Sequence, residues 1–374
     1  MSLNESQPLR GLAAGYGGRL AARYRAGDRA PAARLLIAVL VLMALSSLTF
    51  SVMMGASDAS ALDVLHDLVY GNADQSALSL RDRIIIFDIR MPRAILGFLI
   101  GASLAVSGAV MQGLFRNPLA DPGLVGVSAG ASLGAVTVIV LGGTVAAPLF
   151  QFLGIFALPI AAFLGGLATT LILYRVATQN GQTSVATMLL AGIALGALAM
   201  AFTGVLIYMA DDKQLRDLTF WSMGSLAGAT WMKIAAAGPI MLACLLLMPF
   251  LARGLNAITL GEAAAFHMGI PVQRLKNIAI VSVAASTGAS VAVSGGIGFV
   301  GIVVPHLLRM VIGPEHRYLL PASALLGGSL LIFADVIARI VVSPAELPIG
   351  IITSAVGGPF FLWILLRNRA RLSL

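Results

Sequence analysis

Residues 101–108 read Gly-Ala-Ser-Leu-Ala-Val-Ser-Gly, and residues 288–295 read Gly-Ala-Ser-Val-Ala-Val-Ser-Gly. The two stretches differ at one position, where Leu104 stands opposite Val291. A shared membrane composition explains part of this likeness, but the match at small residues indicates an internal repeat. Each copy lies inside a long apolar run, so the repeat predicts that one half of the chain copies the architecture of the other.

The composition around these stretches is that of a membrane protein. Of 374 residues, 59% are hydrophobic and 11% are charged, whereas soluble domains carry roughly 25% charged residues. A water-soluble globule cannot bury so much apolar surface. A spanning helix needs about 20 apolar residues, so the length allows about ten spans.

The apolar runs predict an all-α polytopic membrane protein with ten transmembrane helices. The runs lie at residues 35–55, 89–113, 123–141, 146–174, 184–209, 232–251, 275–295, 299–312, 319–341 and 347–366. The repeated stretches fall in the second and seventh spans, which are five spans apart and therefore cross the bilayer in opposite directions. This predicts an inverted repeat, with spans 2–5 matching spans 7–10, as in transporters that alternate access around a midplane site.

The charges predict the orientation of these spans. Residues 1–34 form a tail with six arginines, whereas residues 56–87 carry more acidic than basic residues. Because cytoplasmic loops carry an excess of Lys and Arg, we expect a cytoplasmic tail at 1–34, a permease domain at 35–366 and a cytoplasmic tail at 367–374. The first apolar run is too long for a signal peptide. Short basic clusters between apolar runs also argue against a nucleic-acid role for the net charge of +8.

Several kinds of chemistry are missing from the pattern. The lysines are Lys213, Lys233 and Lys276, and none of them lies in the Gly-Lys-Ser/Thr context of a P-loop. The single Cys244 excludes an internal disulfide framework and a cysteine metal cage. No His, Asp and Glu constellation occurs at one depth of the predicted bundle, which argues against a membrane-embedded enzyme with a catalytic or metal site. Energy for transport must then come from a partner.

Four motifs carry a family resemblance. They are Asp88-Ile-Arg-Met-Pro-Arg93 with the stretch from Gly101 to Ala131, then Gly298-Phe-Val-Gly-Ile-Val-Val-Pro-His306, Leu320-Pro-Ala-Ser-Ala-Leu-Leu-Gly327 and Ala345-Glu-Leu-Pro-Ile-Gly350. In these motifs the chain resembles the permeases of type II ABC importers for cobalamin, ferric siderophores and haem. The resemblance implies a bacterial inner-membrane homodimer, two ATPase subunits that use ATP on the cytoplasmic side, and a periplasmic binding protein.

The connection at 253–274 contains the stretch Thr259-Leu-Gly-Glu-Ala-Ala-Ala-Phe-His-Met-Gly269, followed by Pro271. An acidic start, a histidine in the last turn and a glycine after it predict one short capped helix. By resemblance this is the element that docks on the ATPase; a solvated connector is the alternative. The residues expected to couple are Thr259, Leu260, Gly261, Glu262, Ala263, His267 and Gly269.

Three arginines, Arg90, Arg93 and Arg339, lie at the predicted outer ends of their spans, against the positive-inside tendency. By resemblance they receive acidic residues of the binding protein, a contact that favours orientation and capture rate. The alternative is local pairing. It is strongest for Arg339, because Asp335 lies one helical turn earlier.

The segment after the fifth span predicts a mouth for the pathway. Arg216 suits an anionic group such as a haem propionate, because guanidinium matches carboxylate geometry; pairing with Asp212 or Asp217 is the alternative. Methionine and tyrosine side chains cluster around the outer half of the fifth span and this mouth, where they can line a path for a porphyrin or simply fill space. They are Met200, Tyr208, Met209 and Met223.

Resemblance of 220–226 and 344–350 to haem members favours haem as the substrate, with ferric siderophores and cobalamin as rivals. An ion-coupled secondary transporter is a further alternative. Such proteins place carboxylates within their spans, and Asp335 is the clear candidate here.

Overall fold

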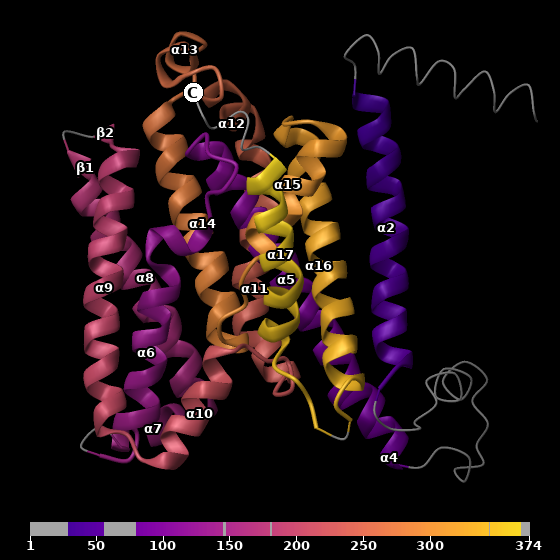
Figure 1. The fold of residues 1–374 in the computed structure, drawn as a ribbon, viewed down its shortest axis with the longest axis vertical. Coiled ribbons are helices and arrows are strands. Elements are labelled where there is room, and N and C mark those ends of the chain that lie inside the picture. Colours follow the sequence, from indigo (N-terminus) through magenta and orange to yellow (C-terminus); the bar gives the residue numbers. More distant parts are fainter. Residues whose placement is uncertain (1–28, 56–79, 145–146, 180–181, 344, 368–374) are drawn as a thin grey trace, which may run out of the picture.

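The computed structural model describes residues 29–55, 80–144, 147–179, 182–343 and 345–367, and nearly all of them are helical (Figure 1). The predicted tails, apart from residues 29–34 and Arg367, and the acidic loop residues 56–79 lie outside the described residues. The helices of the first half are α2 (Ala30–Met53), α4 (Leu80–Arg83), η1 (Ile84–Arg90), α5 (Met91–Leu114), η2 (Pro122–Val125), α6 (Val127–Leu141), α7 (Ala147–Leu153), η3 (Gly154–Phe156), α8 (Ala157–Ala177) and α9 (Val185–Met209).

The second half is helical as well. Its helices are α10 (Asp212–Ser222), α11 (Trp231–Leu247), η4 (Met248–Leu251), α12 (Ala252–Ile258), α13 (Glu262–His267), α14 (Val272–Ser294), α15 (Val300–Ile312), α16 (His316–Ile340) and α17 (Ile349–Arg367). One antiparallel hairpin, β1 (Thr178–Gln179) with β2 (Gln182–Thr183), joins α8 to α9.

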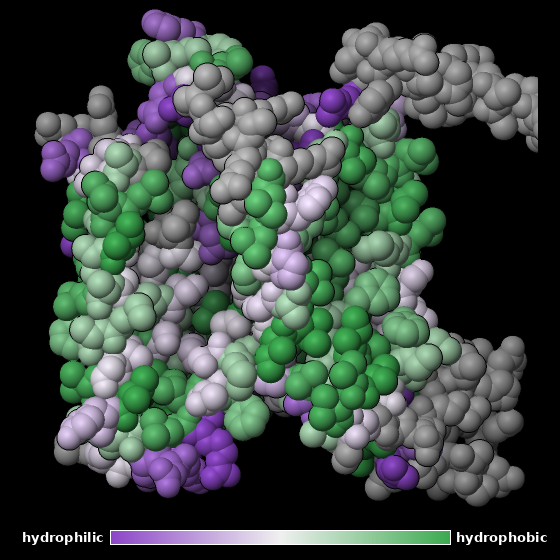
Figure 2. Space-filling model, viewed as in Figure 1, coloured by the Kyte–Doolittle hydropathy of each residue, from purple (hydrophilic) through white to green (hydrophobic). Residues whose placement is uncertain are grey.

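Each of the ten predicted apolar runs is helical over most of its described residues. Among the described residues, seven continuous helical stretches are long and apolar enough to cross a membrane, and three apolar helices are shorter: Val127–Leu141, Val300–Ile312 and Ile349–Ile364. At 1.5 Å per residue, α15 reaches only about 20 Å of the roughly 30 Å hydrocarbon core. The ten-span count therefore stays a prediction. Figure 2 shows apolar side chains over the flank of the bundle and hydrophilic ones at its two ends.

The two halves follow the same order of elements. The repeated stretches lie in α5 and α14; each is followed by a short helix (α6 or α15), a long helix (α8 or α16) and one more helix (α9 or α17). In Figure 1, α6 occupies the half of the bundle nearer α10, and α15 the half nearer α13. This opposite placement of matching short helices is what an inverted repeat requires.

The small residues of the repeat bring helix backbones together. A Cβ atom on Gly101 would lie 2.3 Å from the carbonyl oxygen of Gly327 on α16. A Cβ atom on Gly108 would lie 1.9 Å from that of Gly301 on α15. Close approach of this kind supplies the van der Waals packing that holds helices together in lipid. As a result α5 forms the centre of the bundle: 83% of the residues in its apolar 18-residue segment are buried, whereas only 11% are buried in that of α9.

The two ends of the bundle differ. One carries α13 and the hairpin and is called the α13 end below; the other carries α10 and is called the α10 end (Figure 1). The predicted short capped helix is confirmed as α13, which begins after Gly261 (φ +108°) and ends before Gly269 (φ +79°). Because α12 continues to Ile258 and α14 begins at Val272, the connection is shorter than the predicted 253–274.

Candidate functional site

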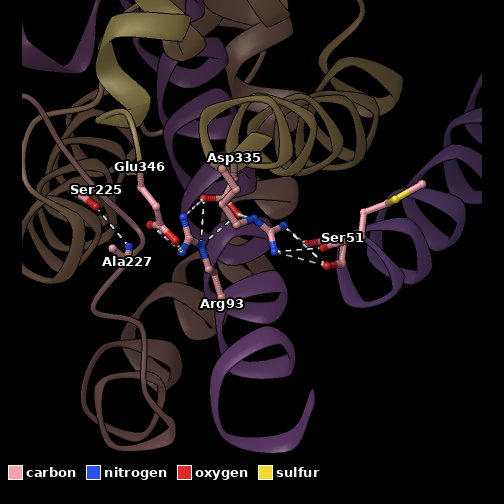
Figure 3. Close-up of polar contacts among 8 residues, drawn as sticks. Ser51, Arg93, Ser225, Ala227, Asp335 and Glu346 are labelled. Atoms are coloured by element: carbon pink, nitrogen blue, oxygen red, sulfur yellow. Dashed lines mark hydrogen bonds and ion pairs between the residues drawn. The ribbon is translucent and has the colours of Figure 1, made fainter. Parts of the chain in front are cut away.

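Charged side chains gather at the α10 end in what we call the arginine cluster. Its members are the buried residues Arg90, Arg93, Asp335 and Arg339 and the partly exposed Glu346. Arg93 on α5 lies between two carboxylates (Figure 3). It donates to Asp335 on α16 through Nε at 3.0 Å and Nη2 at 2.8 Å, and to Glu346 through Nη1 at 2.9 Å. A fork with a carboxylate on each side is the geometry that guanidinium favours.

The other two arginines of the cluster hold the end of α2. Arg339 lies 3.2 Å from Asp335 and donates to the Ser51 hydroxyl at 2.8 Å. Arg90 donates to the carbonyl oxygens of Val52 at 3.0 Å and Met53 at 3.1 Å. The last carbonyls of a helix have no partner inside it and attract cations. The cluster therefore joins α2, α5, α16 and the segment before α17.

The three arginines that were predicted to dock the binding protein are buried. Arg90, Arg93 and Arg339 are 3%, 5% and 4% exposed, so their charges are enclosed by the protein. The local pair of Arg339 with Asp335, the alternative from its spacing, is present. Glu346, at 35% side-chain exposure, is the member of the cluster that reaches the surface. Contact of the cluster with a binding protein stays a prediction.

Two adjoining cavities lie where the two halves meet. The larger, about 440 Å³, is lined by Met223, Gly350 and Ser354 among others. The second, about 370 Å³, is lined by Asp121 before α6 and by residues 296–299, 301 and 302 around the start of α15. It shares Ser222, Gly296 and Gly298 with the first. The second cavity is also lined by the polar residues Ser128 and Thr287.

Backbone hydrogen bonds fix the segments around these cavities. The amide of Ser225, after α10, donates to the Ser294 carbonyl oxygen at 2.7 Å. The amide of Gly350, in α17, donates to the Met223 carbonyl oxygen at 3.1 Å. The turn after α10 is thus held by the end of α14 and the start of α17, which belong to the other repeat.

The predicted pathway residues fall in two places. Met223 lines the larger cavity. On α9, Met200, Tyr208 and Met209 are 72%, 92% and 62% exposed, and Arg216 is exposed on α10. The structure therefore does not gather the five residues around one cavity of this chain; four of them lie on its surface.

The predicted coupling residues come together at the α13 end. Leu260 and Phe266 are 71% and 70% exposed, and Thr259, Glu262, Ala263, His267 and Gly269 are exposed beside them. Ala265, at 0% exposure, anchors α13 against the rest of the bundle. Exposed aromatic and aliphatic side chains on a small protrusion are suited to insertion into a partner's pocket.

A polar network behind α13 was not predicted. Gln273 and Asn277 of α14 contact Tyr174 of α8, and Gln273 and Lys276 contact Thr183 before α9. Lys276 is 3% exposed and is enclosed by this network. A signal was available: in the α14 helix, Gln273, Lys276 and Asn277 share one face at spacings of three and four.

Comparison with known proteins adds a family context to this geometry. The model of the FecCD transport family matches residues 39–367. The chain is 45% identical over 318 residues to the hemin transport system permease protein HmuU of Yersinia pestis, covering 82% of this chain and 94% of that one. It is 43% identical over 287 residues to the cobalamin import system permease protein BtuC of Halobacterium salinarum, covering 77% and 74%.

Further relatives give the same picture. The vitamin B12 import system permease protein BtuC of Klebsiella pneumoniae is 41% identical over 298 residues, covering 79% of this chain and 86% of that one. A solved structure described as an inward-facing conformation of a proposed metal-chelate type ABC transporter superposes with a TM-score of 0.77 at 29% identity, covering 89% and 99%.

Proposed function

The chain belongs to the FecCD transport family, and from that premise we propose that it forms the membrane pathway of a haem importer. Membership makes it the permease of an ABC importer, in which separate subunits hydrolyse ATP. The observation that carries the haem proposal is the 45% identity over 94% of a hemin permease. Cobalamin permeases follow at 43% and 41%, so cobalamin is the alternative substrate.

Exposed charges support a cytoplasmic α13 end. Arg175, Arg253, Arg274 and Arg317 are exposed there beside two acidic residues, Glu262 and Glu315. At the α10 end the exposed acidic residues Asp88, Asp211, Asp212 and Asp217 balance the exposed basic residues Arg81, Arg83, Lys213 and Arg216. An excess of arginine marks the cytoplasmic side of membrane proteins. With this orientation α13 faces the ATPase subunits, the arginine cluster faces the binding protein, and both termini are cytoplasmic.

The exposed surface of α9 supports a homodimer. Beyond Met200 and Tyr208, its residues Leu190 and Ile193 are each 70% exposed. Family resemblance places a second copy against this chain, and the pathway between the copies would then be lined by the exposed soft side chains of α9. Arg216 on α10 would meet a haem propionate near the entrance.

In the proposed cycle, closure of the ATPase subunits displaces the two α13 helices, and the inverted halves expose the pathway to one side and then to the other. An ion-coupled mechanism has little support, because Asp335 is bound to both Arg93 and Arg339 and is poorly placed to bind and release an ion.

Reconstitution tests the substrate. The permease, its ATPase and its binding protein are placed in proteoliposomes, and uptake of haem, cobalamin and a ferric siderophore is compared with and without ATP. We expect ATP-dependent uptake of haem above the other two. Uptake of cobalamin or siderophore without haem would overturn the haem proposal but leave the importer assignment intact.

A further inference from the structure

Lys276 is a buried lysine that touches two separate elements of the α13 end. Its ammonium lies 2.8 Å from both carboxylate oxygens of Glu262, in the first turn of α13. It also donates to the carbonyl oxygen of Thr183, at 3.0 Å. The lysine side chain is 4% exposed, whereas that of Glu262 is 44% exposed. One side chain of α14 therefore contacts both the protruding helix and the segment that leads into α9.

The amide, the hydroxyl and the carbonyl oxygen of Thr183 all form hydrogen bonds to α14. Its backbone amide donates to the Gln273 side-chain oxygen at 3.1 Å, and its hydroxyl accepts from the Gln273 side-chain amide at 2.7 Å. Lys276 binds the remaining carbonyl. The next residue, Ser184, caps α9 through the amide of Thr187 at 3.3 Å. A displacement of Thr183 must therefore move the first turn of α9.

The contact between Lys276 and Glu262 resists breaking. A buried ammonium that loses its carboxylate is left as an uncompensated charge in a poorly hydrated site, which is strongly unfavourable. When α13 moves, Lys276 gains by following Glu262.

We propose that Lys276 is a positioning residue for energy coupling: its ammonium carries the displacement of α13 to the first turn of α9, and so to the wall of the pathway. This inference rests on the proposed role of α13 as the ATPase-docking element. It adds the contacts through which a movement of the docked α13 is carried to the wall of the substrate pathway.

The first test compares transport with ATP consumption in the complete reconstituted importer, using haem as the probe. For Lys276→Met we expect ATP hydrolysis near the level of the unmodified importer and at least about fivefold less haem taken up per ATP, a typical coupling loss. Lys276→Arg should retain most of the coupling, because it keeps a cation beside Glu262. Arg274→Met is the matched control, because Arg274 is exposed on the same turn of α14.

If Lys276→Met does not assemble, the ratio of haem to ATP is measured on the double variant Lys276→Met with Glu262→Gln, which removes the buried charge together with its partner. An unchanged ratio of haem to ATP in the variant that assembles would overturn the proposal.

The second test needs no substrate. Hydrogen–deuterium exchange of residues 183–188 and 262–268 is compared between the nucleotide-free and the ADP–vanadate-trapped complex. In the unmodified protein both segments should change; in Lys276→Met the change at 262–268 should remain and that at 183–188 should disappear. A full-sized change at 183–188 in the variant would overturn the Lys276 proposal alone. No change at 262–268 in the unmodified complex would overturn the coupling role of α13 as well.

Discussion

Arg93 on α5 donates two hydrogen bonds, through Nε and Nη2, to the carboxylate of Asp335 on α16, although the two residues are 242 positions apart in the chain. Asp335 in turn neutralises Arg339 on its own helix at 3.2 Å. One carboxylate thus compensates two buried guanidinium groups. The contact of α5 with α16, which joins the two repeats, is therefore made by charged groups at the α10 end and by the close-packed Gly101 and Gly327 further along.

Replacing Asp335 by alanine should strongly destabilise the permease, because Arg339 loses its carboxylate and Arg93 keeps only Glu346. Breaking a buried pair in this way costs about 3–5 kcal/mol. We expect a large fall in the melting temperature of the detergent-solubilised protein. Asp217→Asn, on the exposed surface of α10, is the control and should change stability by less than about 0.5 kcal/mol. A melting temperature for Asp335→Ala equal to that of the control would contradict the assigned role.

Neutralising Glu346 should speed capture of the binding protein. If acidic side chains of that protein approach the arginine cluster, Glu346→Gln removes the repulsive charge and leaves the arginines in place. We expect the association rate to rise by about threefold at low salt and the gain to vanish at high salt. The rate is measured by surface plasmon resonance on permease in nanodiscs. Glu315→Gln, exposed at the α13 end, is the control; a slower association for Glu346→Gln would sink the docking prediction.

Adding one methyl group at Gly108 should disrupt the bundle. The new Cβ atom would lie 1.9 Å from the Gly301 carbonyl oxygen, so two helix backbones must separate. Overpacking of this kind costs about 1–3 kcal/mol, and the upper end applies against backbone. The melting temperature of Gly108→Ala should fall, whereas Gly196→Ala should be neutral or stabilising because nothing lies within 4 Å of the added atom. Equal stability of the two variants would refute this packing argument.

Shortening Phe266 should weaken ATPase binding without changing the permease fold. The side chain is 70% exposed on α13. Loss of an aromatic anchor at an interface costs about 2 kcal/mol or more. Co-purification of the ATPase with Phe266→Ala should therefore drop by at least about tenfold, with an unchanged melting temperature. Met310→Ala, an exposed apolar change on α15, serves for comparison. Normal ATPase binding by Phe266→Ala would remove α13 from the interface.

The repeat and the helical runs could be predicted because they depend on local pattern. A spanning helix is recognised by its length and apolarity, and α13 by its acidic start and its two glycines. The pair of Asp335 and Arg339 could also be predicted, since a spacing of four fixes two residues on one helix face. The ATPase-docking and substrate roles entered through family resemblance, which no local pattern supplies.

The sequence by itself determined which segments are apolar helices, that two halves repeat, and that one short helix lies between residues 259 and 269. Only the tertiary structure decided that Arg93 pairs with Asp335, that Arg90 and Arg339 close the end of α2, and that Lys276 is buried against Glu262 and Thr183. The physical reason is that helix periodicity fixes contacts within a few residues. A charge buried between helices finds its partner only when packing has chosen which helices are neighbours.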